Sequence, residues 1–293
     1  MSHASEAATD PATATDPATA TDPATATDTG SPPTEPTAWD VVAVAAHPDD
    51  LEIICGGTLA LLVRQGYRVC MIDLTTGEPT PRGSEAIRAS EAEAARLALG
   101  VQRRICLRLP NRELMDDLPA RYALATELRR LRPRLLLACA GHTPAASPDH
   151  LQALRLIEAA RFYAQLTKWD DRFANTPPHR IPHLVYAIMP FEPEQRHWQG
   201  QVVIDISSTF EQKLAAIRAY ESQFDAERFE KLRHFVVAES ASAGAACGFA
   251  YGERFALPQP VGGLDLVQVI EGSKDRSTAA RVQQPGQSHL PFG

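Results

Sequence analysis

The sequence predicts an α/β fold: a Rossmann-like, mostly parallel sheet with helices on both faces, in a single domain. Three observations support this prediction. Short apolar runs alternate with helix-like segments, polar loops follow the apolar runs, and no linker divides the folded part. Such alternation is typical of parallel sheets, because each strand needs a crossover helix before the chain returns to the same edge.

The first half of the predicted domain alternates strands and helices regularly. Each expected strand is a short apolar run, and each expected helix has helical spacing, with Gly66 and Gly100 ending the first two helices. The expected strands are 41–45, 68–74, 105–109 and 135–140. The expected helices are 58–65, 85–99, 120–131 and 149–165.

The region after residue 181 is less regular. Segments 184–189 and 202–206 have the apolar character of strands, and 210–224 has the spacing of an amphipathic helix. We expect this region to extend the sheet and to supply walls to a pocket.

Both ends of the chain are expected to lie outside the fold. Residues 1–37 contain a Pro-Ala-Thr-Ala-Thr-Asp repeat over 11–28 and almost no large apolar residue, so we expect a disordered tail. This tail lacks the basic start and apolar stretch of a secretory signal. The domain is expected to span 38–272, and a flexible polar tail to cover 273–293.

Charge and cysteine usage limit the partners and the compartment. The tail contains six acidic residues and no Lys or Arg, so subtracting its −6 from the net −7 leaves −1 for the rest. We therefore expect no nucleic-acid partner, and no apolar run is long enough to span a bilayer. The five cysteines form no CxxC pair and are expected as core residues in a reducing cytoplasm.

The most informative segment is 46–52, Ala-His-Pro-Asp-Asp-Leu-Glu, which directly follows the first expected strand. Side chains at the C-terminal ends of parallel strands open into the crevice where α/β folds bind ligands. A polar loop with an Asp helix cap is the alternative, and it is the better explanation of a lone His-Pro-Asp. The full pattern of His, two Asp and Glu favours a functional site.

Two further polar loops follow expected strands, and we expect all three loops at one edge of the sheet. The second loop carries Thr-Gly-Glu at 76–78, with Arg88 and Glu91 on the next helix. The third runs from His142 to His150 and ends Ser-Pro-Asp-His.

These loops contain the ligand types of a catalytic zinc site. Such a site takes three protein ligands from His and carboxylate and leaves a position for water, whose pKa falls to about 7. His47 and Asp50 can face one point, and His150 completes the set, although His150 alone is better explained as a packed helix-start residue. Asp49 is then placed to act as general base. Iron or cobalt would fit the same ligands.

Short motifs along the chain carry a resemblance to a known family. They are His47-Pro48-Asp49-Asp50-Leu51-Glu52, Gly56-Gly57-Thr58, Gln65-Gly66-Tyr67, Asp73-Leu74-Thr75, Arg88-x-x-Glu91, Pro148-Asp149-His150, Pro178-His179-Arg180, Asp205-Ile206-Ser207 and Tyr220-Glu221-Ser222-Gln223-Phe224. Over about 41–263 the chain resembles the PIG-L/LmbE family of zinc-dependent N-acetylglucosaminyl deacetylases. It is most similar to the branch that deacetylates N-acetylglucosaminyl malate in bacillithiol biosynthesis.

The resemblance implies the zinc ligands and the general base named above, and it adds two substrate-binding residues. Arg88 and Arg180 match positions expected to bind polar groups of the substrate. A malate group carries two carboxylates, which arginine binds bidentately. The alternative for Arg88 is an exposed helix charge paired with Glu85 or Glu91.

The chain departs from the family pattern at Ser147, where the family has the His expected to act as general acid. Losing a general acid typically costs about 10²- to 10⁴-fold in rate. Asn111 likewise replaces the usual Asp after the third strand. The loop 141–147 is about two residues longer than in close relatives, and our hypothesis is that His142 within it replaces the lost acid. The alternative is a catalytically impaired paralogue that binds metal and sugar.

The sequence thus predicts a zinc-dependent deacetylase with a small-molecule amino-sugar substrate, and the resemblance implies that this substrate is N-acetylglucosaminyl malate. The alternatives are an amidase on another glucosaminyl or thiol conjugate and a non-catalytic binding protein. A nucleotide-binding Rossmann domain is disfavoured, because Gly56-Gly57 lacks the G-x-G-x-x-G spacing. We expect a homo-oligomer, as is common among relatives of this type.

Overall fold

The computed structural model describes residues 38–188 and 200–260, so the expectations for 1–37 and 273–293 lie outside the described residues. A seven-stranded sheet has the order β3-β2-β1-β4-β5-β7-β6. Strands β1 to β5 pair in parallel, and β7 is antiparallel to both β5 and β6. The strands are β1 (Val41–Ala45), β2 (Val69–Thr75), β3 (Arg103–Leu109), β4 (Leu135–Ala140), β5 (His183–Ile188), β6 (Gln201–Asp205) and β7 (Gly252–Ala256).

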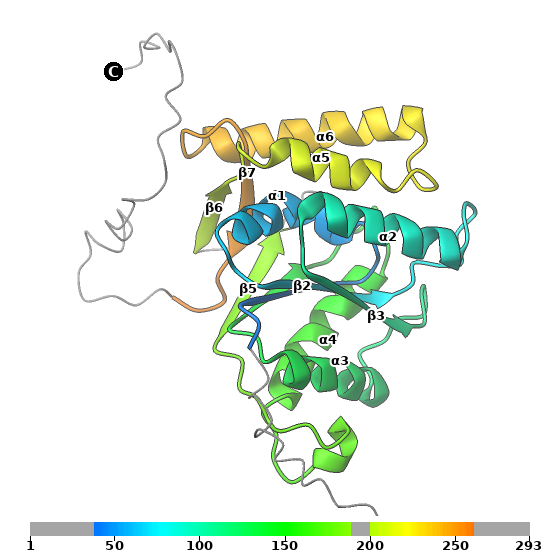
Figure 1. The fold of residues 1–293 in the computed structure, drawn as a ribbon, viewed down its shortest axis with the longest axis vertical. Coiled ribbons are helices and arrows are strands. Elements are labelled where there is room, and N and C mark those ends of the chain that lie inside the picture. Colours follow the sequence, from blue (N-terminus) through cyan, green and yellow to red (C-terminus); the bar gives the residue numbers. More distant parts are fainter. Residues whose placement is uncertain (1–37, 189–199, 261–293) are drawn as a thin grey trace, which may run out of the picture. The chain divides into compact units, whose positions relative to one another are not determined.

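Helices cover both faces of this sheet, which confirms the predicted α/β fold. Helices α1, α2, α5 and α6 lie on one face, and α3 and α4 lie on the other (Figure 1). The helices are α1 (Asp50–Arg64), α2 (Glu85–Leu99), α3 (Leu118–Leu131), α4 (Asp149–Tyr163), α5 (Phe210–Arg218) and α6 (Ala226–Ala245), with a short 3₁₀ helix, η1 (Asp170–Phe173).

The central strands are buried on both faces, as expected for parallel strands under two helix layers. All five residues of β1 are buried. Val42 and Val44 pack in the core under α3 and α4, whereas Val41, Ala43 and Ala45 pack in the core under α1, α2 and α5. The continuous apolar run of β1 therefore fills two separate cores.

Helix α1 begins at Asp50, eight residues before the predicted start, and is bent at Cys55, where φ is −137° and ψ is 17°. The bend frees backbone N–H groups in the middle of the helix. Those of Gly57 and Thr58 donate to the Glu253 carboxylate at 3.0 and 2.7 Å. Gly57 permits the close packing here, because a Cβ at that position would lie 2.8 Å from the Ile206 side chain.

The region after β5 contains more regular structure than predicted. The expected helix 210–224 ends at Arg218, and a 20-residue helix, α6, follows it. The Asp225 side chain caps α6 by accepting from the Arg228 N–H at 3.0 Å. The sequence did not suggest α6, because few of its positions are buried and its apolar face is interrupted by Ser and Ala.

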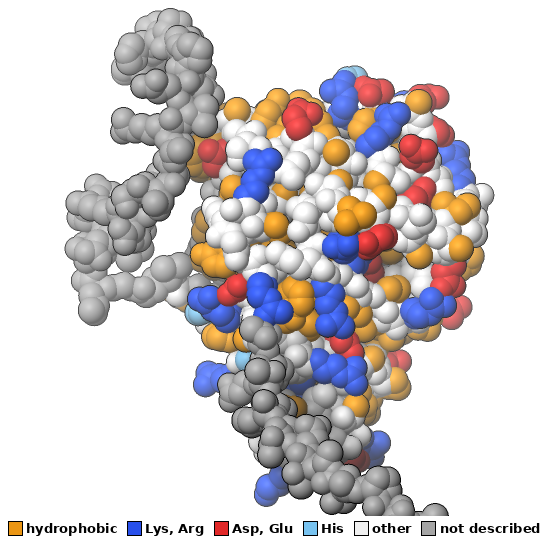
Figure 2. All heavy atoms as spheres, in the orientation of Figure 1, with side chains coloured by type: hydrophobic (Ala, Val, Ile, Leu, Met, Phe, Trp, Pro, Cys, Tyr) orange, Lys and Arg blue, Asp and Glu red, His pale blue; other side chains and the backbone are white. Residues whose placement is uncertain are grey.

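The strand order reverses between β1 and β4, and in open α/β sheets such a reversal marks the edge, at the C-terminal ends of the strands, where ligands bind. The loops after β1, β2 and β4 meet this edge of the sheet. On the outer surface, basic, acidic and apolar side chains are interspersed over the upper half of the face in Figure 2. Among residues 38–188 and 200–260, no helix is both long enough and apolar enough to cross a membrane.

Candidate metal centre

Three of the predicted site residues meet at this edge of the sheet: His47 from the loop after β1, Asp50 from the start of α1, and His150 from the start of α4. One potential ligand atom from each lies within 4.8 Å of the others. The Asp50 carboxylate is central, with Oδ2 at 3.3 Å from His47 Nδ1 and Oδ1 at 3.3 Å from His150 Nε2. The fold thus brings together, around one point, residues from two loops that lie far apart in the sequence.

The chemistry of this cluster fits a divalent metal. His150 Nε2 is buried without a hydrogen-bond partner, as expected for a nitrogen that gives its lone pair to a cation. Burial alone would lower the pKa of His47, but the carboxylates of Asp149 and Asp50 outweigh it and raise that pKa to about 10. Burial would likewise raise the pKa of Asp50, but His150 and His47 hold it well below its usual range. The centre therefore favours positive charge, and two His with one carboxylate suit zinc.

Each histidine is also held through its second ring nitrogen. His47 Nε2 lies 3.2 Å from Asp149 Oδ2, which accepts the Arg112 backbone N–H at 2.7 Å. His150 Nδ1 lies 2.8 Å from the Thr143 hydroxyl. Partners of this kind orient metal-binding histidines and fix which nitrogen faces the metal. His47 Nδ1 and His150 Nε2 are accordingly the nitrogens that face Asp50.

Asp49, the predicted general base, lies beside the ligands with a strained backbone. Its φ of 108° is in the region that L-residues rarely adopt, and such strain clusters at functional sites. Burial raises the pKa of its carboxyl group to about 7, although the Arg88 guanidinium acts in the opposite direction. Asp49 is thus held next to the centre by its backbone and by an ion pair of 3.1 Å with Arg88.

Arg88 is only 4% exposed, so the alternative of an exposed helix charge is wrong. Its Nη2 donates to the Pro48 carbonyl at 2.8 Å and to Asp49 at 3.1 Å. Its Nε and Nη1 are buried without a hydrogen-bond partner. The guanidinium lies over the Tyr220 ring, 5.4 Å from its centroid. The proposed partner Glu91 instead accepts from the Ser222 backbone and hydroxyl.

A buried ionic network lies behind the centre and was missed in the sequence. Arg104 binds Asp73 through two hydrogen bonds of 2.6 and 2.8 Å and donates to Glu52 at 2.5 Å. Tyr220 also donates to Glu52, at 2.9 Å. Glu52 therefore has a structural role. The signal that could have revealed the network is a pair of opposite charges, Asp73 and Arg104, inside two neighbouring apolar strands.

The loop before α4 contains the residues that depart from the family pattern. His142 is exposed, and Ser147 is half-buried. The Ser147 hydroxyl accepts the Asp149 backbone N–H at 3.3 Å, so it helps to start α4. His142 is not among the three clustered ligands, and its role in catalysis stays a prediction.

Arg180 does not lie at the centre of a single chain, contrary to our expectation. It is exposed and precedes β5, whose first residue His183 pairs with Leu135 at the start of β4. The neighbouring His179 Nε2 lies 2.9 Å from the Pro133 carbonyl, also before β4. The centre lies at the other ends of these strands, roughly 20 Å away for a six-residue strand. A motif match does not show at which edge of the sheet a residue lies.

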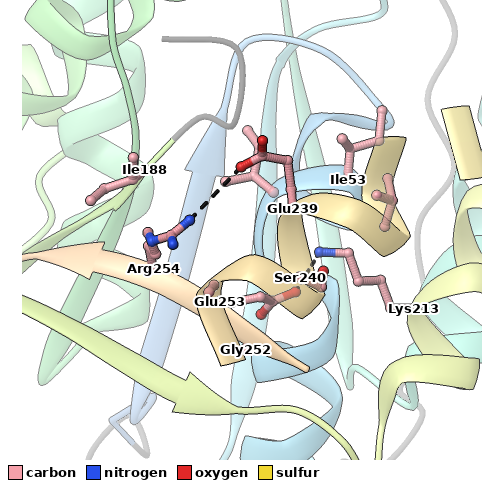
Figure 3. Close-up of a pocket in the computed structure, with 11 residues that line it drawn as sticks. Ile53, Ile188, Lys213, Glu239, Ser240, Gly252, Glu253 and Arg254 are labelled. Atoms are coloured by element: carbon pink, nitrogen blue, oxygen red, sulfur yellow. Dashed lines mark hydrogen bonds and ion pairs between the residues drawn. The ribbon is translucent and has the colours of Figure 1, made fainter. Parts of the chain in front are cut away.

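A second hollow lies between α1, α5, α6 and β7 and encloses about 450 Å³, including open solvent (Figure 3). Lys213 and Glu253 form a buried ion pair there, with Nζ 2.6 Å from Oε1, and Glu239 and Arg254 form a looser pair at 3.8 Å. Glu253 is the carboxylate that binds the free N–H groups of α1. The Lys213–Glu253 pair therefore supports the helix whose first residue is Asp50.

Comparison with known proteins agrees with this architecture. Residues 42–161 match the PIG-L family model, described as GlcNAc-PI de-N-acetylase. A 4-oxalmesaconate hydratase from Pseudomonas putida is 30% identical over 62% of this chain and 73% of its own. A diacetylchitobiose deacetylase from Thermococcus kodakarensis is 29% identical over 73% of this chain and 80% of its own.

A solved structure extends the similarity to most of the fold. A conserved protein from Thermus thermophilus superposes with a TM-score of 0.66 at 34% identity, covering 78% of this chain and 98% of its own. The matched family segment contains His47, Asp50 and His150. The chain therefore belongs to the PIG-L family, the family of the GlcNAc-PI de-N-acetylase.

Proposed function

We propose that this protein hydrolyses the N-acetyl group of an N-acetylglucosaminyl conjugate, with zinc held by His47, Asp50 and His150. The observation that carries the proposal is the buried cluster of two His and one Asp, with His150 Nε2 lacking a partner and Asp49 beside it. Membership of a family of deacetylases supports the reaction class.

Bound zinc would supply a Lewis acid and a water of lowered pKa. Asp49 would accept the proton of the attacking water. Arg88 donates a hydrogen bond to Asp49 Oδ2, so we assign Asp49 Oδ1 as the atom that accepts the proton. The strained backbone of Asp49 keeps the carboxylate in place without a contribution from the substrate.

Arg88 would bind the polar part of the substrate. Its Nε and Nη1 both lack a partner. Their N–H groups point to different sides of the guanidinium, so each would donate to a separate acceptor, such as a carboxylate oxygen or a sugar hydroxyl. The two carboxylates of N-acetylglucosaminyl malate make this conjugate our first choice of substrate.

The leaving amine needs a proton, and Ser147 cannot supply one near neutral pH. We propose that His142, on the same loop, supplies it. The variant His142→Ala should lose about 10²- to 10⁴-fold in turnover while keeping its zinc. Turnover like that of the wild type would contradict this role and would leave Asp49 to return the proton that it accepted.

The direct test is acetate release from N-acetylglucosaminyl malate, with diacetylchitobiose as the comparison substrate. We expect release that stops on chelation and returns with added zinc. Zinc and sugar binding without release would contradict the hydrolase and support an impaired paralogue. The variant Asp50→Asn should lose zinc and release together.

A second candidate function is the hydration of an unsaturated carboxylic acid. It is favoured by the 4-oxalmesaconate hydratase from Pseudomonas putida, which is 30% identical over 199 residues. Hydration also needs a base and an anion-binding arginine, and this centre offers both. Loss of the substrate's conjugated absorbance, without acetate release from any amide, would support this candidate.

A further inference from the structure

The structure assigns to Thr143 a positioning role: its hydroxyl sets the ring tautomer of His150 so that Nε2 is free to bind metal. This inference rests on the metal centre proposed above. It concerns a residue of the loop that departs from the family pattern, outside the ligand set itself. The role is indirect, because Thr143 acts through His150.

The Thr143 hydroxyl lies between two groups. Oγ1 is 2.8 Å from His150 Nδ1 and 3.3 Å from the Ser147 carbonyl oxygen. Thr143 and His150 are 5% and 6% exposed, so water does not substitute for either contact. The loop is closed by a hydrogen bond of 3.0 Å from the Ala146 N–H to the Thr143 carbonyl.

The direction of the hydroxyl decides the tautomer. A carbonyl only accepts, so Thr143 must donate when it bonds to Ser147, and it then accepts from His150 Nδ1–H. In a neutral ring with Nδ1 protonated, Nε2 has a free lone pair. That atom is the one that faces Asp50 Oδ1 at 3.3 Å and has no hydrogen-bond partner.

The test compares zinc affinity in four proteins, measured by competition with a chromophoric chelator. Thr143→Val keeps the shape and removes the hydroxyl, and loss of such a partner typically weakens metal binding about 10- to 100-fold. Thr143→Ser keeps the hydroxyl and should stay close to wild type. Thr126→Val is the control, since the Thr126 hydroxyl bonds within α3, to the Tyr122 carbonyl at 2.7 Å.

Two further measurements separate positioning from folding. Melting of the metal-free proteins should be similar for Thr143→Val and Thr126→Val, and Thr143→Ala serves in place of the valine variant if that one does not fold. Long-range ¹H–¹⁵N spectra of the zinc-loaded wild type should show His150 protonated at Nδ1.

The outcomes distinguish this inference from the proposed function. Wild-type zinc affinity in Thr143→Val, or an equal loss in Thr143→Ser, overturns the role of Thr143 and leaves the metal centre intact. A wild-type protein that binds no zinc overturns the metal centre and this role together. Weakened zinc binding in Thr143→Val, with wild-type binding in Thr143→Ser and Thr126→Val, supports both the metal centre and the role of Thr143.

Discussion

From the buried ion pair between Lys213 and Glu253 we predict how the free energy of unfolding changes when the lysine charge is removed. Both side chains are at most 3% exposed, and the Glu253 carboxylate also accepts the N–H groups of Gly57 and Thr58. The variant Lys213→Met keeps the aliphatic stem and removes the charge. Glu253 then stays buried without its cation, while Gly57 and Thr58 continue to donate to it.

Removing one partner of a buried pair typically costs about 3–5 kcal/mol. The two backbone donors reduce the loss, so we expect about 3 kcal/mol in the free energy of unfolding. For a domain of this size each kcal/mol shifts Tm by about 2–4 °C, which gives a decrease of about 6–12 °C. Adding Glu253→Gln should recover part of the loss, because the remaining buried carboxylate becomes neutral.

Urea denaturation of the metal-free proteins, followed by circular dichroism, measures this loss. The matched control is Lys231→Met, because Lys231 and Glu227 form an ion pair that is 75% and 80% exposed. An exposed pair contributes less than about 1 kcal/mol. If Lys213→Met costs no more than Lys231→Met, the argument that this pair supports α1 is refuted.

Three further predictions concern the centre. Asp49→Asn should lower turnover about 10²- to 10⁴-fold with zinc retained, and full turnover in this variant would exclude Asp49 as the base. Turnover of the wild type should fall as the pH drops through the pKa of Asp49. A bound cation lowers that pKa from about 7. In the His142→Ala background, Ser147→His should raise turnover at least about 10-fold in steady-state assays, because it restores an acid on the same loop, and no gain would contradict the need for a general acid. Arg180→Ala should leave kcat/KM unchanged. Arg88→Met should lower kcat/KM about 10- to 150-fold, because a hydrogen bond to a charged group contributes about 1.5–3 kcal/mol. Equal losses in the two variants would contradict the placement of Arg180 away from the centre.

The order and type of the central elements could be predicted because their signals are local. Strands β1 and β4 are continuous apolar runs, and α2 has both its start signal, Ser84, and its end signal, Gly100. The start of α1 was missed because its first turn contains Asp50 of the candidate metal centre, and because Gly56-Gly57 is typical of a break between elements. Functional residues displaced the usual helix pattern there.

The clustering of His47, Asp50 and His150 could be predicted because parallel topology places the ends of β1 and β4 together. Their supporting contacts could not, because each joins residues from separate elements. Arg104 and Glu52 are 52 positions apart, and Glu253 and Thr58 are 195 positions apart. Distances of this kind depend on the register and twist of the whole sheet, which no local pattern specifies.

The bond from Gly57 to Glu253 spans 196 residues, and this separation orders events during synthesis. At about 5–20 residues per second, about 10–40 s pass between the two residues leaving the ribosome. Throughout that interval residues 50–64 lack the Glu253 carboxylate that holds the bend of α1 in the folded protein. His47 and Asp50 are thus among the first parts of the fold to be made, and the support of the helix that carries Asp50 is among the last. We therefore expect the proposed metal centre to be complete only after β7 has joined the sheet.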